Sequence, residues 1–111
     1  MSPPTNAERR ERDAIAARLA QAGFALPGTL LERHTSCGKP GCRCQADPPR
    51  LHGPYHQWTR KIEGKTVTRR LTAEQAELYG PWFDQARQLR DLLGQLETLS
   101  LSIFERTLDS D

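Results

Sequence analysis

The stretch that decides the fold is CGKPGCRC at residues 37–44, because it contains all three cysteines of the chain. The cysteines are Cys37, Cys42 and Cys44, and their odd number argues against a disulfide framework. Clustered cysteines of this kind are typical of metal ligands in a reducing compartment. Three thiolates can fill three corners of a tetrahedral zinc site. Pro40-Gly41 suits the central positions of a type II turn, and such a turn would fold Cys37 back towards Cys42.

A structural zinc site needs a fourth ligand, and the sequence offers three histidines. We predict His52, because the turn His52-Gly53-Pro54-Tyr55 can return the imidazole to the cysteines. His34 and His56 are the alternatives. Lys39 and Arg43 place positive charge beside the thiols, which is expected to lower their pKa and favour a bound Zn²⁺.

The cysteines have two other interpretations besides a zinc site. In the first, the three cysteines are ordinary small hydrophobic residues of a loop, which their polar surroundings disfavour. In the second, Cys42 and Cys44 form a redox pair. Catalysis is not expected, because catalytic zinc needs an open position and a general base. The nearby acids Glu32, Asp47 and Glu63 form no recognisable motif, and a Cys–His nucleophile pair lacks a third member.

The bulk composition indicates one small domain with a thin core. Leu, Ile, Val and Phe supply only 21 of 111 residues, and small domains with thin cores usually need metal, disulfides or oligomerisation. The start of the chain has no apolar signal region, and no stretch reaches the ~18 apolar residues of a membrane span. We therefore expect a cytoplasmic protein without a membrane partner.

The net charge of +2 hides a strong asymmetry along the chain. Residues 30–70 contain nine Lys or Arg and three acids, whereas residues 71–111 contain three Arg and eight acids. A basic middle attracts polyanions, and an acidic end faces solvent or a protein.

Local patterns predict an α+β fold with three regions in one folded domain: an N-terminal helix in 1–27, a zinc knuckle with a β-hairpin in 28–71, and a long kinked C-terminal helix in 72–111. The first helix is expected at about residues 6–22, capped by Thr5 or Asn6 and ended by Gly23. Strands are expected at 29–35, 55–62 and 65–71, the last two joined by Glu63-Gly64.

The C-terminal helix is expected to begin at a capping box of Thr72 and Gln75. Pro81 predicts either a kink or a second helix that starts there. Apolar residues recur at four- and three-residue steps along this segment, as in a coiled coil. We predict a dimer interface at Leu89, Leu93, Leu96 and Ile103; the alternative is that these residues form the chain's own core.

A two-residue turn at Glu63-Gly64 fixes the faces of the hairpin. Trp58, Ile62, Val67 and Leu71 share one face, which is expected to pack inward. The other face carries hydroxyl, amide and cationic side chains, which suit phosphates and base edges. The residues predicted to bind nucleic acid are Lys39, Arg43, Arg60, Lys61, Lys65, Arg69 and Arg70. The plainer interpretation is a solvated strand face, with Arg69 lying on Trp58 as a cation–π pair.

The run at residues 37–44, followed by His52-Gly53-Pro54-Tyr55, resembles a family of short bacterial proteins with a domain of unknown function. The resemblance covers about residues 28–105 and implies zinc ligation by Cys37, Cys42, Cys44 and His52. Members of that family are often encoded near transposases and recombinases. A looser similarity, in Trp58-x-Arg60, Gly64-Lys65 and Thr72-Ala73-Glu74, is to the three-stranded DNA-binding arms of phage-type integrases.

These observations lead to two hypotheses. The first is a zinc-stabilised DNA-binding accessory or regulatory protein of a mobile genetic element. The second is a zinc-stapled protein-interaction module that dimerises through its C-terminal helix. A thiol-dependent enzyme is a third, less favoured class.

Overall fold

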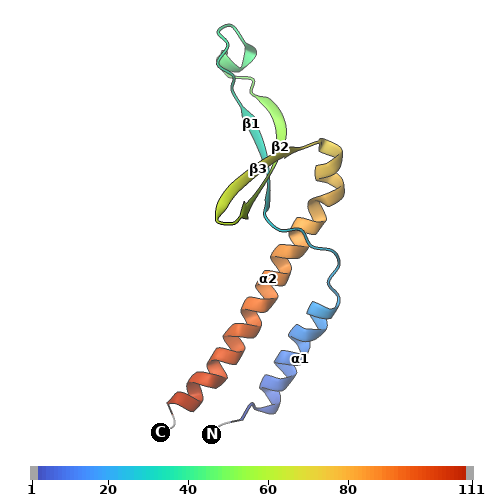
Figure 1. Cartoon of the computed structure of the whole chain (residues 1–111), viewed down its shortest axis with the longest axis vertical. Coiled ribbons are helices and arrows are strands. Elements are labelled where there is room, and N and C mark those ends of the chain that lie inside the picture. Colours follow the sequence, from blue (N-terminus) through green and yellow to red (C-terminus); the bar gives the residue numbers. More distant parts are fainter. Residues whose placement is uncertain (1–2, 110–111) are drawn as a thin grey trace. The chain divides into compact units, whose positions relative to one another are not determined.

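The computed structural model describes residues 3–109, which adopt the predicted α+β fold of a helix, a three-stranded antiparallel sheet and a long helix (Figure 1). The elements in chain order are α1 (Asn6–Ala20), β1 (Thr29–Thr35), the short 3-10 helix η1 (Arg43–Gln45), β2 (His52–Ile62), β3 (Lys65–Leu71) and α2 (Ala73–Leu108). The predicted ranges 1–27 and 72–111 include residues 1–2 and 110–111, which lie outside the described residues.

Helix α1 begins with a capping box. The hydroxyl of Thr5 accepts the Glu8 N–H at 3.1 Å, and the Glu8 carboxylate accepts the Thr5 N–H at 2.8 Å. These bonds satisfy two backbone donors that a helix start would otherwise leave unpaired. Thr5 is thus the cap rather than Asn6, and the helix ends with Gln21 at its C-cap rather than at Gly23.

Helix α2 begins with the capping box that the sequence predicts. The Gln75 amide oxygen accepts the Thr72 N–H at 2.9 Å, and the Thr72 hydroxyl accepts the Gln75 N–H at 3.1 Å. Pro81 lies inside one helix, so the alternative of a second helix starting there is wrong. Because proline has no N–H, the helix omits one backbone bond at this point while the turns on either side continue.

The chain divides into two compact units, the first made of α1 and the part of α2 from Asp84 onward. In this unit Ile15 and Leu92 are buried, with 5 % and 1 % exposure. The two helices run antiparallel. Just beyond the end of α1, the Gly23 N–H donates to the Gln85 side chain, near the start of this part of α2.

An ion pair joins the two helices at the other end of this unit. Arg106 donates to both carboxylate oxygens of Glu8, at 2.8 and 3.0 Å. The hydrogen bonds from Arg106, with those from Thr5, lower the pKa of Glu8 to about 2. The first unit therefore combines apolar burial with a bidentate ion pair.

The predicted dimer residues of α2 have different environments. Leu89, Leu96 and Ile103 are half-buried, and the last two line a hollow shared with Glu8 of α1. Leu93 is 52 % exposed. The chain thus covers part of its leucine seam with its own first helix, and pairing with a second chain stays a prediction.

The second unit, Leu26–Phe83, contains the sheet in the order β1-β2-β3 and the first turns of α2. The β2–β3 register follows the predicted two-residue turn, with Ile62 opposite Lys65 and Trp58 opposite Arg69. Both turn residues have positive φ, 50° for Glu63 and 80° for Gly64. Such turns match the twist of the two strands, which is why this connection fixes the register.

The face of the sheet that bears Trp58 and Leu71 lies against the first turns of α2, since both residues line a hollow with Tyr79. Trp58 and Leu71 are half-buried. The expectation that this whole face packs inward is wrong for Ile62 and Val67, which are 42 % and 40 % exposed. They lie next to the turn, and the helix covers only the other end of the hairpin.

Candidate metal centre

The three cysteines lie in a loop, residues 36–51, that connects β1 to β2 and that we call the knuckle. Thr35 at the end of β1 pairs with His52 at the start of β2, so the two strands close the base of the loop. Figure 1 shows the knuckle at the tip of the β1–β2 pair, beyond the end of β3. Cys44 is its only buried residue. The knuckle therefore has almost no apolar core of its own.

A tight turn brings Cys37 and Cys42 together. The Cys42 N–H donates to the Lys39 carbonyl at 3.3 Å, and Gly41 has a φ of +81°. These are the features of a type II turn with Pro40 and Gly41 at its centre, as predicted. After it, η1 turns the chain again, and its N–H bonds to the preceding carbonyls place Cys44 beside Cys37.

His52 is brought to the thiols by an irregularity in the β1–β2 pairing. The register shifts between Arg33 and Thr35, opposite the start of β2. Gly53, with a φ of +126°, lies so close to β1 that an added Cβ would be 2.7 Å from the Arg33 carbonyl oxygen. Only glycine fits both restrictions. Residues 52–55 are thus the irregular start of β2 rather than the predicted turn, and Gly53 permits this backbone next to the knuckle.

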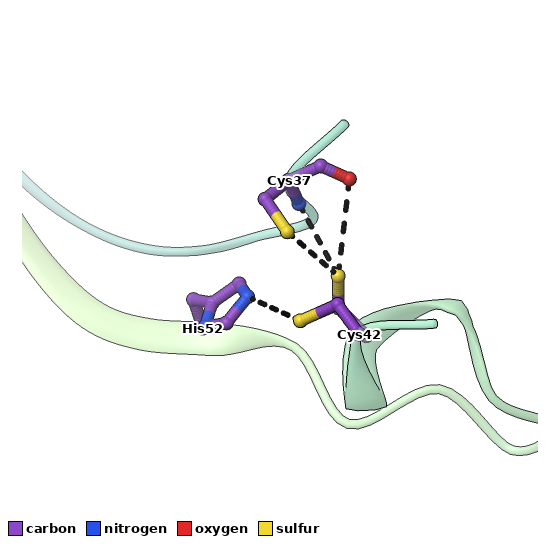
Figure 2. Close-up of side chains that lie close together, drawn as sticks. Cys37, Cys42 and His52 are labelled. Carbon is purple, nitrogen blue, oxygen red and sulfur yellow. Dashed lines mark hydrogen bonds between the residues drawn. The ribbon is translucent and has the colours of Figure 1, made fainter. Parts of the chain in front are cut away.

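The ligand atoms of Cys37, Cys42, Cys44 and His52 all lie within 4.8 Å of one another. The Cys42 sulfur is 3.2 Å from the His52 Nε2 atom, and the Cys37 and Cys44 sulfurs are 3.5 Å apart. Figure 2 shows the His52 ring turned towards the Cys42 sulfur. Neighbouring ligand atoms of a tetrahedral zinc ion are roughly 3.5–3.8 Å apart, given bonds of about 2.0–2.3 Å. The four side chains thus form a candidate site for one metal ion.

Neither alternative histidine belongs to this cluster. His34 is an exposed residue of β1. His56 is paired with Leu71 on β3 and lines a hollow with Ala76 of α2. Strand pairing thus directs His56 to α2 rather than to the knuckle.

Hydrogen bonds have the largest effect on the pKa of Cys37 and of Cys44. The Cys37 N–H donates to the Cys44 sulfur at 3.3 Å, and this bond, with those from the Cys37, Cys42 and His52 side chains, lowers the pKa of Cys44 to about 6. A backbone bond at Lys39 lowers the pKa of Cys37, but its bonds to Cys44 and Cys42, together with burial, raise it overall. The sequence suggested instead that the charges of Lys39 and Arg43 would lower both.

One supporting residue, Gln45, was not anticipated. Its amide nitrogen donates to the Cys37 carbonyl at 2.6 Å and approaches the Cys44 sulfur at 3.7 Å. Residues that hold ligands in place commonly bond to them in this way. A lone glutamine after the last cysteine carries no spacing signal that would have identified it.

The seven predicted nucleic-acid residues do not lie on one surface. The register places Lys61 and Arg70 on the face of the sheet opposite Trp58, and Arg60, Lys65 and Arg69 on the face of Trp58. The remaining two, Lys39 and Arg43, are exposed in the knuckle.

Two of these arginines lie over aromatic rings. Arg60 lies over Trp58 at 4.3 Å, so the expectation that Arg69 would take this position is wrong. Arg60 lies two residues from Trp58 along β2 and Arg69 lies opposite Trp58 on β3, so both arginines are on the face of Trp58. Arg70 lies over Tyr55 at 4.1 Å on the opposite face.

The face with Lys61 and Arg70 is here called the polar face. Its residues are those of the three strands that alternate with Trp58 and its partners: Thr29, Leu31, Arg33, Tyr55, Gln57, Thr59, Lys61, Thr66, Thr68 and Arg70. It contains three cations and no carboxylate. Arg33 and Gln57 are linked at 3.4 Å, and the hydroxyls of Thr59 and Thr68 are 3.3 Å apart. Apart from the exposed Leu31, the face consists of side chains with hydrogen-bonding groups, and its net charge is positive.

Residues 5–80 match the family described as a domain of unknown function (DUF6788), so the chain belongs to that family. The match includes α1 and ends inside α2, whereas the sequence led us to expect 28–105. No curated protein and no solved structure matched the chain. Within residues 3–109, neither helix combines the length and the apolar character needed to cross a bilayer.

Proposed function

We propose that this DUF6788 protein is a zinc-stabilised nucleic-acid-binding protein, acting in an accessory or regulatory role rather than as an enzyme. The observation that carries the proposal is the polar face, with Arg33, Lys61 and Arg70 and no acid. Cations, hydroxyls and amides are the groups that contact phosphates and base edges. A small sheet can also present such a face to a DNA groove.

The metal centre supports this function by holding the sheet. Three thiolates and one imidazole are a donor set that suits zinc, and four protein ligands leave no open position for catalysis. The ion would fasten the end of β1 to the start of β2, the two strands that carry Arg33 and Lys61. Lys39 and Arg43 would then extend the positive surface beyond the sheet.

A role at the DNA of a mobile genetic element rests only on the family resemblance of the sequence. Members of that family are often encoded near transposases and recombinases. The DNA of such an element would offer the phosphates that the polar face suits. The location that goes with this role is the cytoplasm.

The metal is tested first, on protein purified without added metal. About one zinc per chain is expected, and its removal by a chelator should lower the melting temperature of the sheet. Protein that contains no metal and melts unchanged with a chelator would contradict the zinc assignment, and the three thiols should then be tested for redox chemistry.

DNA binding is tested by measuring the affinity for a duplex at several salt concentrations. The affinity should fall steeply with salt, and Lys61→Glu with Arg70→Glu should weaken it and reduce the log–log salt slope by about 2. Arg87→Glu with Arg90→Glu on α2 makes the same change in net charge and should have little effect. Equal losses in both double variants, or no salt dependence, would contradict a role for the polar face.

The second candidate function, a protein-interaction module, is favoured by a row of exposed apolar residues on α2. Leu93, Leu101, Phe104 and Leu108 are 52–58 % exposed and recur at intervals that place them along one side of the helix. This function predicts that Leu93→Asp abolishes self-association measured by sedimentation while duplex affinity is unchanged.

A further inference from the structure

A hollow lies between the hairpin and the first turns of α2, on the face of the sheet opposite the polar face. Its volume is about 350 Å³, within the range of small-molecule sites. Its walls include four aromatic side chains, those of Trp58, Tyr79, Trp82 and Phe83. Tyr79 and Trp82 meet edge to face, with ring centres 5.0 Å apart. An aromatic-walled hollow favours a flat, apolar ligand.

The Trp58 wall is fixed before any ligand binds. The Trp58 indole N–H donates to the Pro27 carbonyl at 2.8 Å, and its ring meets that of buried Phe83 at 6.1 Å between ring centres. Gly28, with a φ of +91°, passes so close that an added Cβ would lie 2.8 Å from the Trp58 Nε1 atom. A wall held in this way costs little ordering entropy when a ligand arrives.

The polar groups of the hollow are donors. No lining residue is an acid, and Gln75 uses its amide oxygen to accept the Thr72 N–H, which leaves its amide N–H groups as donors. Arg70 also lines the hollow, but its guanidinium lies over Tyr55. Arg69 is exposed and is therefore the cation that can meet a ligand. Such a lining complements an anion.

We propose that this hollow binds a planar aromatic ring that carries an anionic group, and that its ligand is a nucleotide. The base would lie against Trp58 and Tyr79, and its phosphate would pair with Arg69. The same chemistry is available from a free mononucleotide and from an unpaired base of a single strand. The site goes beyond the proposed duplex binding, because it lies on the other face of the sheet.

Intrinsic fluorescence tests the proposal, because Trp58 and Trp82 are the only tryptophans of the chain and both line the hollow. The metal-loaded full chain is titrated with AMP, with a short single-stranded oligodeoxyadenylate, and with ribose 5-phosphate, which has the anion but no base. Saturable quenching is expected with the first two only. If the single strand binds more tightly than AMP, the ligand is an unpaired base of a strand. If it binds equally or more weakly, the ligand is a free nucleotide.

The matched variants are Arg69→Gln, in the hollow, and Arg87→Gln, on the part of α2 outside it. Arg69→Gln should raise the Kd for AMP by about tenfold, since a charge-assisted hydrogen bond is lost. Arg87→Gln should leave it unchanged. No saturable quenching with either nucleotide ligand, or equal effects of the two variants, overturns the proposal. Because Arg69 lies on the face opposite the polar face, Arg69→Gln should leave the duplex affinity unchanged.

Discussion

The knuckle and the pair formed by α1 and α2 stabilise their parts of the chain by different means. In the knuckle the only buried side chain is that of Cys44, and three thiols converge with one imidazole. In the helix pair, Ile15 and Leu92 are buried and Arg106 bonds to both carboxylate oxygens of Glu8. A short chain with few large apolar residues thus buries some of them between the helices, whereas the knuckle has a candidate metal site in place of an apolar core.

The largest expected effect comes from removing one metal ligand. His52→Ala should lower zinc affinity more than about 100-fold, since losses of supporting residues alone reach 10–100-fold. The knuckle should then open, and trypsin should cut after Arg43 and Arg50. The helical circular dichroism should persist, because the four candidate ligands all lie outside the helix pair.

The matched control for this variant is His34→Ala, which changes a histidine outside the cluster. It should retain one zinc per chain and resist trypsin like the original chain. Equal zinc loss in both variants would contradict the assignment of His52. Loss of the helical signal in His52→Ala would show that the two regions are not independent.

A middle-sized effect is expected from Leu92→Ala, which empties the most buried position of the helix pair. The loss of packing should reduce the free energy of unfolding by about 2–5 kcal/mol while zinc content stays the same. The neighbouring Leu93→Ala, at a position 52 % exposed, should cost less than about 0.5 kcal/mol in a monomer. If Leu93→Ala costs as much as Leu92→Ala, a partner must cover Leu93.

The smallest expected effect is the pH dependence of the Glu8–Arg106 pair. The folded pKa of Glu8 is about 2, against an ordinary value of 4.5. The pair therefore stabilises the helices fully above about pH 4.5, and this contribution disappears as the pH falls towards 2. The melting temperatures of the original chain and of Glu8→Gln should differ above pH 4.5 and converge near pH 2. A difference that is constant across this range would contradict the ion-pair explanation.

Short-range patterns were enough to predict most of the fold. The capping box at Thr72 and the turn at Glu63-Gly64 depend on neighbouring residues, and both are present. The three expected strands are also present, although β2 starts at His52 rather than at 55. The residues that the predicted strand omitted, 52–54, lie at the irregularity in the β1–β2 pairing. This irregularity depends on contact with β1 and leaves no signal in the local alternation of side chains.

Predictions that depended on distant packing were less successful. The partial exposure of Ile62 and Val67 follows from how far α2 extends over the hairpin, which a strand pattern does not contain. The position of Arg60 over Trp58 required a choice between two arginines on the same face. At the metal centre, the cysteine spacing indicated the ligand types, whereas Gln45 could be recognised only from its contacts.

The strand order β1-β2-β3 leaves both outer strands with one row of backbone groups that no strand of the sheet pairs. Such edges are templates on which a further strand can add, and this is a common route to aggregation. Strand β3 carries Lys65, Arg69 and Arg70 and no acid, whereas β1 carries Glu32 beside Arg33. Because like charges repel an approaching copy of the same edge, the cations of β3 disfavour pairing between two β3 edges. Arg70 of the polar face, which suits a polyanion, is thus also one of the cations that keep the open β3 edge from pairing with another copy.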